Sequence, residues 1–169
     1  MDALLVMNPQ NSFLTTGGSV YMGEKAEILK VRLVDFLSGC RFLKVFFREK
    51  HALEDQFFIN DVTHSLANTS DFLIVETLAK YADQFWDKTR YSAFYETNLE
   101  KFLVQKHIRH VGLAGLETHT SVLFTAEGLR NRGYEVSVIE PCTMSRDDYM
   151  HGYAVTLMKN NLGVRIINV

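Results

Sequence analysis

The chain has 169 residues, of which 47% are hydrophobic and 22% charged, and its formal net charge is -2. These values are typical of one globular domain, spanning 1–169, with a single sizeable core. The charge balance excludes the basic surface that nucleic-acid binding requires, and no apolar run is long enough to span a membrane. We therefore expect a small-molecule ligand as partner, with no nucleic acid and no membrane.

The two cysteines, Cys40 and Cys142, are too few for a disulfide framework in a chain of this length. We expect both to be free thiols in a reducing environment. The N-terminal residues enter an apolar segment directly, without the charged region and cleavage site of a signal peptide. The sequence therefore predicts a cytoplasmic protein.

Strand-like and helix-like segments alternate along the chain. Hydrophobic spacing predicts a strand at 3–7, a helix at 24–37 and a strand at 42–47, followed by a long polar loop at 48–70. The same spacing predicts helices at 72–82, 95–106, 118–132 and 147–160, and strands at 84–87, 111–114, 134–139 and 164–169.

This alternation predicts a three-layer α/β/α domain with a mainly parallel sheet. In open sheets of this type, ligands bind beyond the carboxyl ends of the strands. Asn8, Glu49, Lys88 and the turn at Gly115 each lie just past a predicted strand end. We therefore expect these four positions to converge on one pocket.

The segment 115–126 resembles the nucleophile turn of the isochorismatase-like cysteine hydrolases, which include the nicotinamidases. Their pattern is roughly G-x-x-T-x-x-C-V-x-x-T-A, and Ser121 stands where the family has its cysteine. The chain matches the pattern at five other positions, namely Gly115, Thr118, Val122, Thr125 and Ala126.

Further segments carry the resemblance across nearly the whole chain. Residues 4–13 are similar to the family opening L-L-V-I-D-x-Q-N-D-F, with Asn8 in place of the catalytic aspartate. Residues 88–94 are similar to the segment K-x-x-Y-S-A-F, whose catalytic lysine falls on Lys88. Residues 133–136 and 145–151 look like the downstream strand and loop. The resemblance implies the isochorismatase-like hydrolase fold.

The resemblance also implies a reaction. In the family, the aspartate takes the proton of the thiol, the lysine steadies the charges, and the thiolate attacks an amide carbonyl. Backbone N–H groups, here of Glu117 and Ser121, hold the oxyanion beside a cis peptide bond expected at Leu116–Glu117. Asn8 cannot act as the base, and a serine hydroxyl is far less acidic than a thiol. Asn8 also removes the acid of the isochorismatase branch, which works without the cysteine.

Two hypotheses follow. The chain is either a divergent hydrolase that cleaves a C–N bond in a small planar amide, or a catalytically silent homologue that binds a small ligand or a protein partner. A hydrolase would use Lys88, Ser121 and the backbone N–H groups, and a Ser121–Lys88 dyad with a neutral lysine stays open.

A metal site is also implied. Glu49-Lys50-His51 is similar to the D-x-H metal motif of the nicotinamidases, and His64 falls near a further histidine ligand. One carboxylate and two imidazoles suit Zn²⁺ or Fe²⁺. The alternative is a polar loop with surface histidines.

Aromatic residues flank the expected pocket and either belong to the core or stack on a planar ligand; they are Phe13, Trp86, Tyr91 and Phe94. Phe57 and Phe58 are hydrophobic residues within the polar loop and suggest a subunit contact, since the family commonly forms homo-oligomers.

Side chains around the turn suggest local structural roles. Thr118 is expected to cap the following helix and His119 to lie at its start. Glu117, His119 and Ser121 cannot form a triad, because residues two apart do not readily converge. His151, together with Ser145 and Arg146, is expected to stabilise the loop before the last helix.

Overall fold

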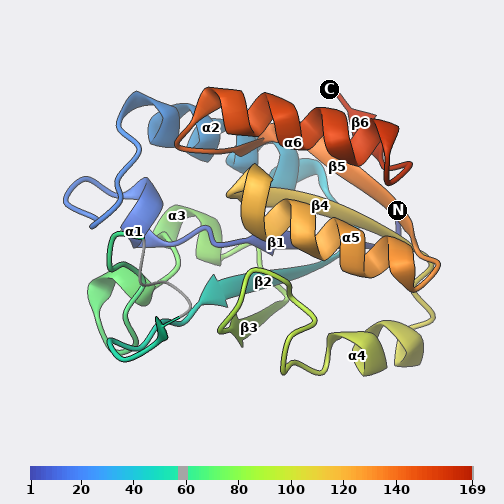
Figure 1. Cartoon of the computed structure of the whole chain (residues 1–169), viewed down its shortest axis with the longest axis horizontal. Helices are drawn as coiled ribbons and strands as arrows, with labels where there is room; N and C mark the ends of the chain where they lie inside the picture. Colours follow the sequence, from blue (N-terminus) through green and yellow to red (C-terminus); the bar gives the residue numbers. More distant parts are fainter. Residues whose placement is uncertain (57–60, 169) are drawn as a thin grey trace.

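The computed structural model describes residues 1–56 and 61–168, and Figure 1 shows their arrangement. Its sheet has six strands in the order β3-β2-β1-β4-β5-β6, and every neighbouring pair is parallel. The strands are β1 (Ala3–Met7), β2 (Leu43–Glu49), β3 (Gln84–Lys88), β4 (His110–Leu116), β5 (Glu135–Met144) and β6 (Arg165–Ile167). The predicted parallel sheet is confirmed.

Helices cover both faces of the sheet, so the molecule has three layers. The helices are α1 (Asn11–Leu14), α2 (Glu24–Gly39), α3 (Glu76–Ala79), α4 (Leu99–Gln105), α5 (Leu123–Asn131) and α6 (Asp148–Asn160). One core cluster joins α1, α2 and α3 to the sheet, and the second joins α4, α5 and α6 to the other face. In Figure 1, α5 and α6 lie side by side across the strands.

The hydrophobic pattern explains these layers. In β1, Leu4 and Val6 belong to the first cluster, whereas Leu5 and Met7 belong to the second, as expected for a strand that is buried on both faces. The buried leucines of α2 follow one another every four residues and form a single helical stripe; they are Leu29, Leu33 and Leu37.

The helix predicted at 72–82 is wrong for most of its length. A 3₁₀ turn at Ser70–Phe72 and the four-residue helix α3 take its place. Between them, Ile74 forms an antiparallel bridge with Gln10, and the N–H of Val75 donates to the Pro9 carbonyl at 3.0 Å. These tertiary contacts hold the intervening residues extended, which the helical spacing of their apolar side chains could not indicate.

Two further helices begin later than predicted. The helix α4 starts at Leu99 because Glu96 has a φ of 50° and the Thr97 hydroxyl accepts from the Leu99 N–H at 3.2 Å. The helix α5 is preceded by a π-helical turn at Thr118–Val122. Thr118 is not a helix cap, since its Oγ1 bonds Nδ1 of His151 at 2.8 Å.

The close approach of β1 and β4 requires a glycine near the end of β4, shortly before the π-helical turn. Gly115 pairs with Met7 in the sheet and has a φ of 98°. A Cβ atom at Gly115 would lie 2.0 Å from the Met7 carbonyl oxygen, closer than any side chain allows. The peptide bond between Leu116 and Glu117 is cis, as expected from the resemblance.

Three other expectations concern membrane-spanning helices, the two cysteines and a subunit contact. Within the described residues, no helix is long and apolar enough to cross a membrane. Cys40 and Cys142 are both free, as predicted. The suggested subunit contact at Phe57 and Phe58 falls outside the described residues.

Candidate active site and metal-binding cluster

Three strand ends and the turn meet in one buried polar cluster, as the sequence predicted. Ser121 Oγ accepts hydrogen bonds from Lys88 Nζ at 3.0 Å and from Asn8 Nδ2 at 3.1 Å. The side chains of Asn8, Lys88 and Ser121 are all essentially inaccessible to solvent. Residues separated by up to 113 positions are therefore brought within hydrogen-bond distance.

A carboxylate also faces the serine. Ser121 Oγ donates to Glu49 Oε1 at 3.0 Å, and Lys88 Nζ donates to the same oxygen at 2.9 Å. The sequence analysis considered only Asn8 and Lys88 as groups that could activate Ser121. The sequence placed Glu49 in the same pocket as Asn8 and Lys88 but gave it a role only in the metal motif, so its hydrogen bond with Ser121 was not predicted.

The strands explain how Glu49 reaches this position. Glu49 and Lys88 are opposite one another in the parallel register of β2 and β3, so their side chains point to the same face. The buried side chain of Gln10 fixes the Glu49 backbone: its Oε1 accepts from the Glu49 N–H at 2.7 Å, and its Nε2 donates to the Glu49 carbonyl at 2.9 Å. The carboxylate is thus presented from a rigid strand end.

The hydrogen-bond capacity of the serine fixes the direction of its proton. A hydroxyl has one donor and two acceptor positions. Lys88 and Asn8 fill both acceptor positions of Ser121, so its one O–H donates to Glu49. This arrangement leads the proton toward a carboxylate and surrounds the oxygen with two donors.

Charge and burial act in opposite directions at Glu49. Burial alone would raise the pKa of this carboxyl, but the Lys88 ammonium and the contact with His64 outweigh burial and hold the pKa well below its usual range. Burial lowers the pKa of Lys88, and the attraction of Glu49 offsets part of that effect. The two groups therefore form a buried ion pair at 2.9 Å.

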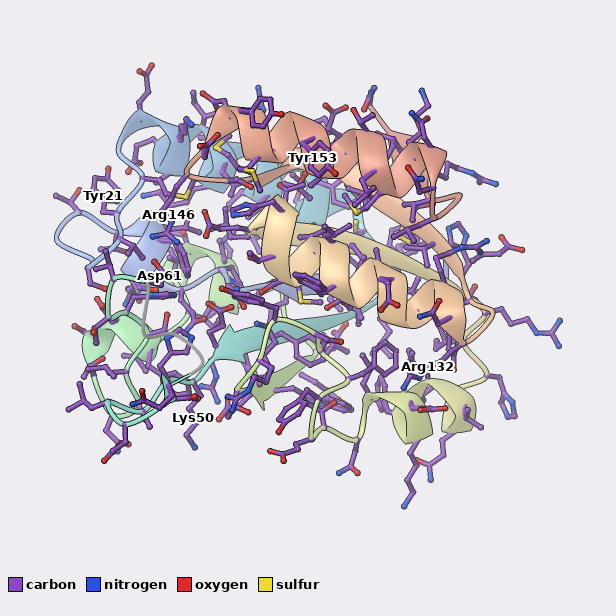
Figure 2. The ribbon with its side chains drawn as sticks, viewed as in Figure 1. Tyr21, Lys50, Asp61, Arg132, Arg146 and Tyr153 are labelled. Carbon is purple, nitrogen blue, oxygen red and sulfur yellow. The ribbon has the colours of Figure 1, made fainter. Side chains whose placement is uncertain are left out.

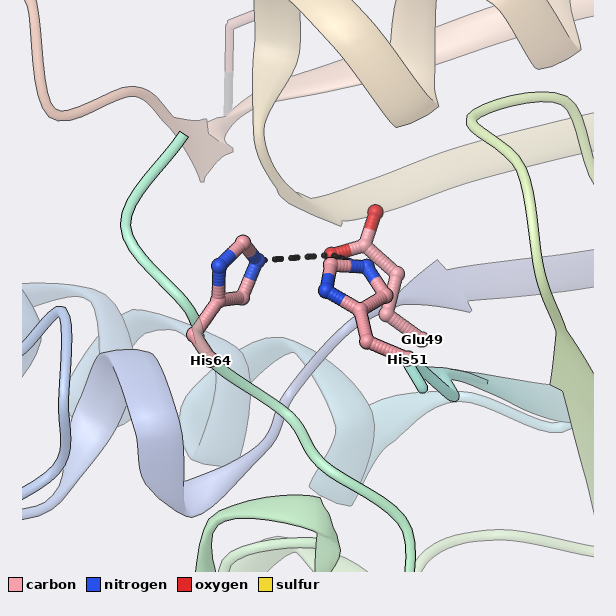
Figure 3. Close-up of side chains that lie close together, drawn as sticks. All are labelled: Glu49, His51 and His64. Carbon is pink, nitrogen blue, oxygen red and sulfur yellow. Dashed lines mark hydrogen bonds and ion pairs between the residues drawn. The ribbon is translucent and has the colours of Figure 1, made fainter. Parts of the chain in front are cut away.

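The second oxygen of Glu49 faces two imidazoles. Glu49 Oε2 lies 3.4 Å from His64 Nε2 and 3.9 Å from His51 Nε2, and Figure 3 shows the three side chains gathered around one point. All three are buried, and one ligand atom from each lies within 4.8 Å of the others. The alternative of surface histidines is wrong.

The donor set fits a divalent transition metal. Ligand atoms about 2.0–2.2 Å from a tetrahedral Zn²⁺ lie roughly 3.3–3.6 Å apart, close to the spacings around Oε2. Burial lowers the pKa of His51 to about 4, so that its imidazole is neutral at pH 7, as a metal ligand must be. For His64, burial would lower the pKa, but Glu49 outweighs this effect and raises it above the usual value.

Asn8 carries a second unusual feature. It has a φ of 48°, a conformation that asparagine tolerates better than most residues. Its buried Oδ1 has no hydrogen-bond partner within the described residues, although its Nδ2 is bonded to Ser121. Such an orphaned acceptor is costly unless a ligand or water donates to it.

The predicted pocket aromatics lie in different surroundings. Phe13 is buried with its ring 5.2 Å from the His64 ring, and Tyr91 stacks on Phe124 at 5.8 Å beside a cavity of about 460 Å³. Trp86 packs between Phe47 and Phe102, with centroid distances of 5.7 and 5.0 Å. Phe94 packs against Gly128 and under Arg132. Contact of these rings with a ligand stays a prediction.

The loop before α6 is tied to the turn that carries Ser121, a connection that the sequence did not reveal. His119 Nδ1 bonds Ser145 Oγ at 2.9 Å, and His151 bonds the turn through Thr118. Arg146 pairs with the buried carboxylate of Glu117 at 3.0 Å. Ser145 and Arg146, from the loop before α6, and His151, from α6 itself, therefore support the turn.

Together, the three-layer fold, the parallel strands and the polar residues at their carboxyl ends define an α/β protein with a buried polar cluster at one edge of its sheet. A family model described as the isochorismatase domain matches residues 2–168. The chain belongs to the isochorismatase family.

Known relatives agree with this assignment. The isochorismatase family protein YaaI of Bacillus subtilis is 36% identical over 85 residues, a match that covers 50% of this chain and 47% of YaaI. The crystal structure of nicotinamidase PncA from B. subtilis superposes with a TM-score of 0.88 at 27% identity, covering 99% of this chain and all of that one. The crystal structure of the pyrazinamidase/nicotinamidase of Streptococcus mutans superposes with a TM-score of 0.89 at 25% identity, covering 99% of this chain and all of that one.

Proposed function

We propose that this protein is a serine-dependent amide hydrolase that cleaves the C–N bond of a small, planar carboxamide. The observation that carries the proposal is the single proton route at Ser121, which leads to Glu49 Oε1 at 3.0 Å. Ser121 would be the nucleophile, Glu49 the general base and Lys88 the cation that stabilises both. Similarity to B. subtilis PncA, named a nicotinamidase, supports a pyridine-type carboxamide as substrate.

In the proposed reaction, the Ser121 proton moves to Glu49 as Oγ attacks the amide carbon. Lys88 and Asn8 donate to Oγ while its negative charge develops, and the backbone N–H groups of Glu117 and Ser121 would receive the oxyanion. Glu49 then returns the proton to the leaving nitrogen, and ammonia departs. A water, deprotonated by Glu49, would then attack the acyl-serine ester; the bond from carbon to Oγ breaks, Glu49 returns the proton to Ser121 Oγ, and the carboxylic acid is released.

The orphaned acceptor of Asn8 supports an amide rather than an ester substrate. A primary carboxamide brings N–H donors next to its carbonyl carbon, and Asn8 Oδ1 has no partner in the described part of the chain. An N–H of the substrate would satisfy this acceptor close to the attacking oxygen. The substrate would thus compensate the desolvation of a buried polar atom.

A metal held by Glu49 Oε2, His51 and His64 would supply a Lewis acid that can bind a pyridine-type nitrogen. The residues of this chain would orient the substrate around that interaction. The Phe13 ring packs against His64 and limits the rotation of this imidazole.

The second candidate is a catalytically silent member of the family that binds a small ligand. It is favoured by the depressed pKa of Glu49, which Lys88 and His64 lower against the effect of burial, because a carboxylate so well stabilised is a weak base. In that case the cluster would serve to hold a ligand or a metal.

The two candidates are separated by assaying the purified protein for ammonia release from nicotinamide and pyrazinamide, with and without added Zn²⁺ or Fe²⁺. We expect turnover that disappears in Ser121→Ala, together with an acyl adduct on Ser121 in mass spectra of quenched reactions. Absence of turnover in the native protein, with activity appearing in Asn8→Asp/Ser121→Cys, would refute the hydrolase proposal for these substrates.

A further inference from the structure

Arg146 lies outside the cluster around Ser121 and Glu49, but it binds two segments that bear on that cluster. Its Nε and Nη2 atoms donate to the two carboxylate oxygens of Glu117 at 3.1 and 3.0 Å. Its Nη1 and Nη2 atoms donate to the two oxygens of Asp61 at 3.2 and 3.1 Å. One guanidinium thus makes two forked contacts, the geometry in which arginine is most specific.

Each carboxylate belongs to a different side of the site. Glu117 is only 5% exposed and opens the turn that carries Ser121. Asp61 precedes His64 by three residues, and His64 Nε2 lies 3.4 Å from Glu49 Oε2. Arg146 therefore links the nucleophile side of the site to the imidazole side. Figure 2 places Arg146 and Asp61 beside one another.

The charges reinforce this link. Burial would lower the pKa of Arg146, but its hydrogen bonds to Glu117 and Asp61 raise the pKa above its usual value. At Asp61, burial would raise the pKa, whereas the bonds and charge of Arg146 lower it. The guanidinium also neutralises the Glu117 carboxylate, whose negative charge would otherwise oppose an oxyanion held at the backbone N–H of the same residue.

We propose that Arg146 is a positioning residue that fixes the Ser121 turn relative to the His64 segment. This inference rests on the proposed function for its effect on catalysis, but not for its effect on structure. Displacement of a reacting group by about 1 Å costs on the order of 100-fold in rate, so the loss of such a link is expected to be visible in kcat.

The test compares Arg146→Met and Arg146→Lys with Arg132→Met. Arg132 is a matched control because it also pairs with a carboxylate, Glu100 at 2.9 Å, and packs over the Phe94 ring at 4.2 Å. Figure 2 shows Arg132 at the end of the molecule opposite Arg146. Arg146→Lys keeps the positive charge but loses the forked hydrogen bonds of the guanidinium group.

Amide hydrogen exchange on the metal-free protein is the first measurement. We expect faster exchange at residues 61–66 and 115–122 in Arg146→Met, a smaller change in Arg146→Lys and none in Arg132→Met. Unchanged exchange in either segment of Arg146→Met would overturn the link. If Arg146→Met does not fold, Asp61→Asn and Glu117→Gln are used, and each should accelerate both segments.

Kinetics with nicotinamide is the second measurement. We expect kcat to fall about 10- to 100-fold in Arg146→Met, with KM changed much less and partial recovery in Arg146→Lys. An equal loss in Arg132→Met would overturn a positioning role. If the native protein shows no turnover, the proposed function fails, and hydrogen exchange alone decides whether Arg146 links the two segments.

Discussion

The ends of the neighbouring strands β1 and β2 carry opposite chemistry. β1 is followed directly by the neutral amide of Asn8, whereas β2 ends in the carboxylate of Glu49, and both side chains contact Ser121 Oγ, at 3.1 and 3.0 Å. The isochorismatase-like pattern that residues 4–13 resemble has its carboxylate at the end of β1. In this chain, the acidic group that faces Ser121 comes from the adjacent strand.

This difference shows that the chemistry of a strand-end site depends on what the side chains reach, and less on which strand carries them. β1 and β2 are parallel and in register from Ala3–Leu43 to Met7–Phe47, so their ends lie at one edge of the sheet. Glu49 has one methylene more than an aspartate and extends one oxygen to Ser121 and the other to the imidazoles. A single carboxylate thus serves two groups of residues.

The largest expected effect is on catalysis when the β2 carboxylate is neutralised. Glu49→Gln should lower kcat for nicotinamide by about 10²–10⁴-fold, the usual contribution of a general base. Asp87→Asn is the matched control, because Asp87 is also an acid at the end of a strand but pairs with Arg48 at 2.6 Å. Steady-state kinetics of both variants gives the comparison. Equal activity in Glu49→Gln and the native protein would exclude Glu49 as the base.

Moving the carboxylate from the end of β2 to the end of β1 tests whether activity depends on the strand that carries it. Adding Asn8→Asp to Glu49→Gln places a carboxylate oxygen where Asn8 Nδ2 now lies, 3.1 Å from Ser121 Oγ. We expect this double variant to recover at least about tenfold of the lost kcat, within the range that a positioned base contributes. A double variant no more active than Glu49→Gln alone would mean that the two strand ends are not interchangeable.

The next effect is on stability. Lys88 and Glu49 form a buried ion pair, so Lys88→Met leaves an uncompensated carboxylate and should cost about 3–5 kcal/mol in the free energy of unfolding. Lys88→Met/Glu49→Gln should cost less than the sum of the single variants, since neither charge is then left alone. Urea denaturation of the four proteins measures this coupling, and strictly additive costs would argue against a buried pair.

The sequence predicted the parallel sheet and the convergence of Asn8, Lys88 and Ser121, because strand periodicity and the resemblance place each of them at a strand end or turn. It also brought Glu49, His51 and His64 together correctly. What the sequence could not supply is the direction of a side chain. Glu49 was predicted to lie just past a strand end, but its hydrogen bond to Ser121 depends on strand register and side-chain length. The pairing of Arg146 with Glu117 and Asp61 is a tertiary contact without a local signal.

Metal binding provides a further test, because none of the three candidate ligands comes from the β1 end. His64→Ala removes one of the three candidate ligands and should weaken Zn²⁺ binding by at least about 100-fold, more than the 10- to 100-fold lost with an outer partner of a ligand. Isothermal titration of the chelator-treated protein measures the affinity. The control is His110→Ala, since His110 bonds Ser137 at the opposite end of β4. No Zn²⁺ binding by the native protein would refute the metal site.

The smallest expected effect comes from the β1 end. Asn8→Ala removes one neutral donor to Ser121 Oγ, and a net hydrogen bond is worth about 0.5–1.5 kcal/mol, which corresponds to roughly a 2- to 12-fold loss in kcat. The change also removes the orphaned Oδ1, so the free energy of unfolding should fall little or even rise. Kinetics and urea denaturation of the same preparation measure both quantities. A loss in kcat as large as that of Glu49→Gln would contradict the proposed difference between the two strand ends, because the neutral amide of Asn8 would then contribute as much to kcat as the carboxylate of Glu49.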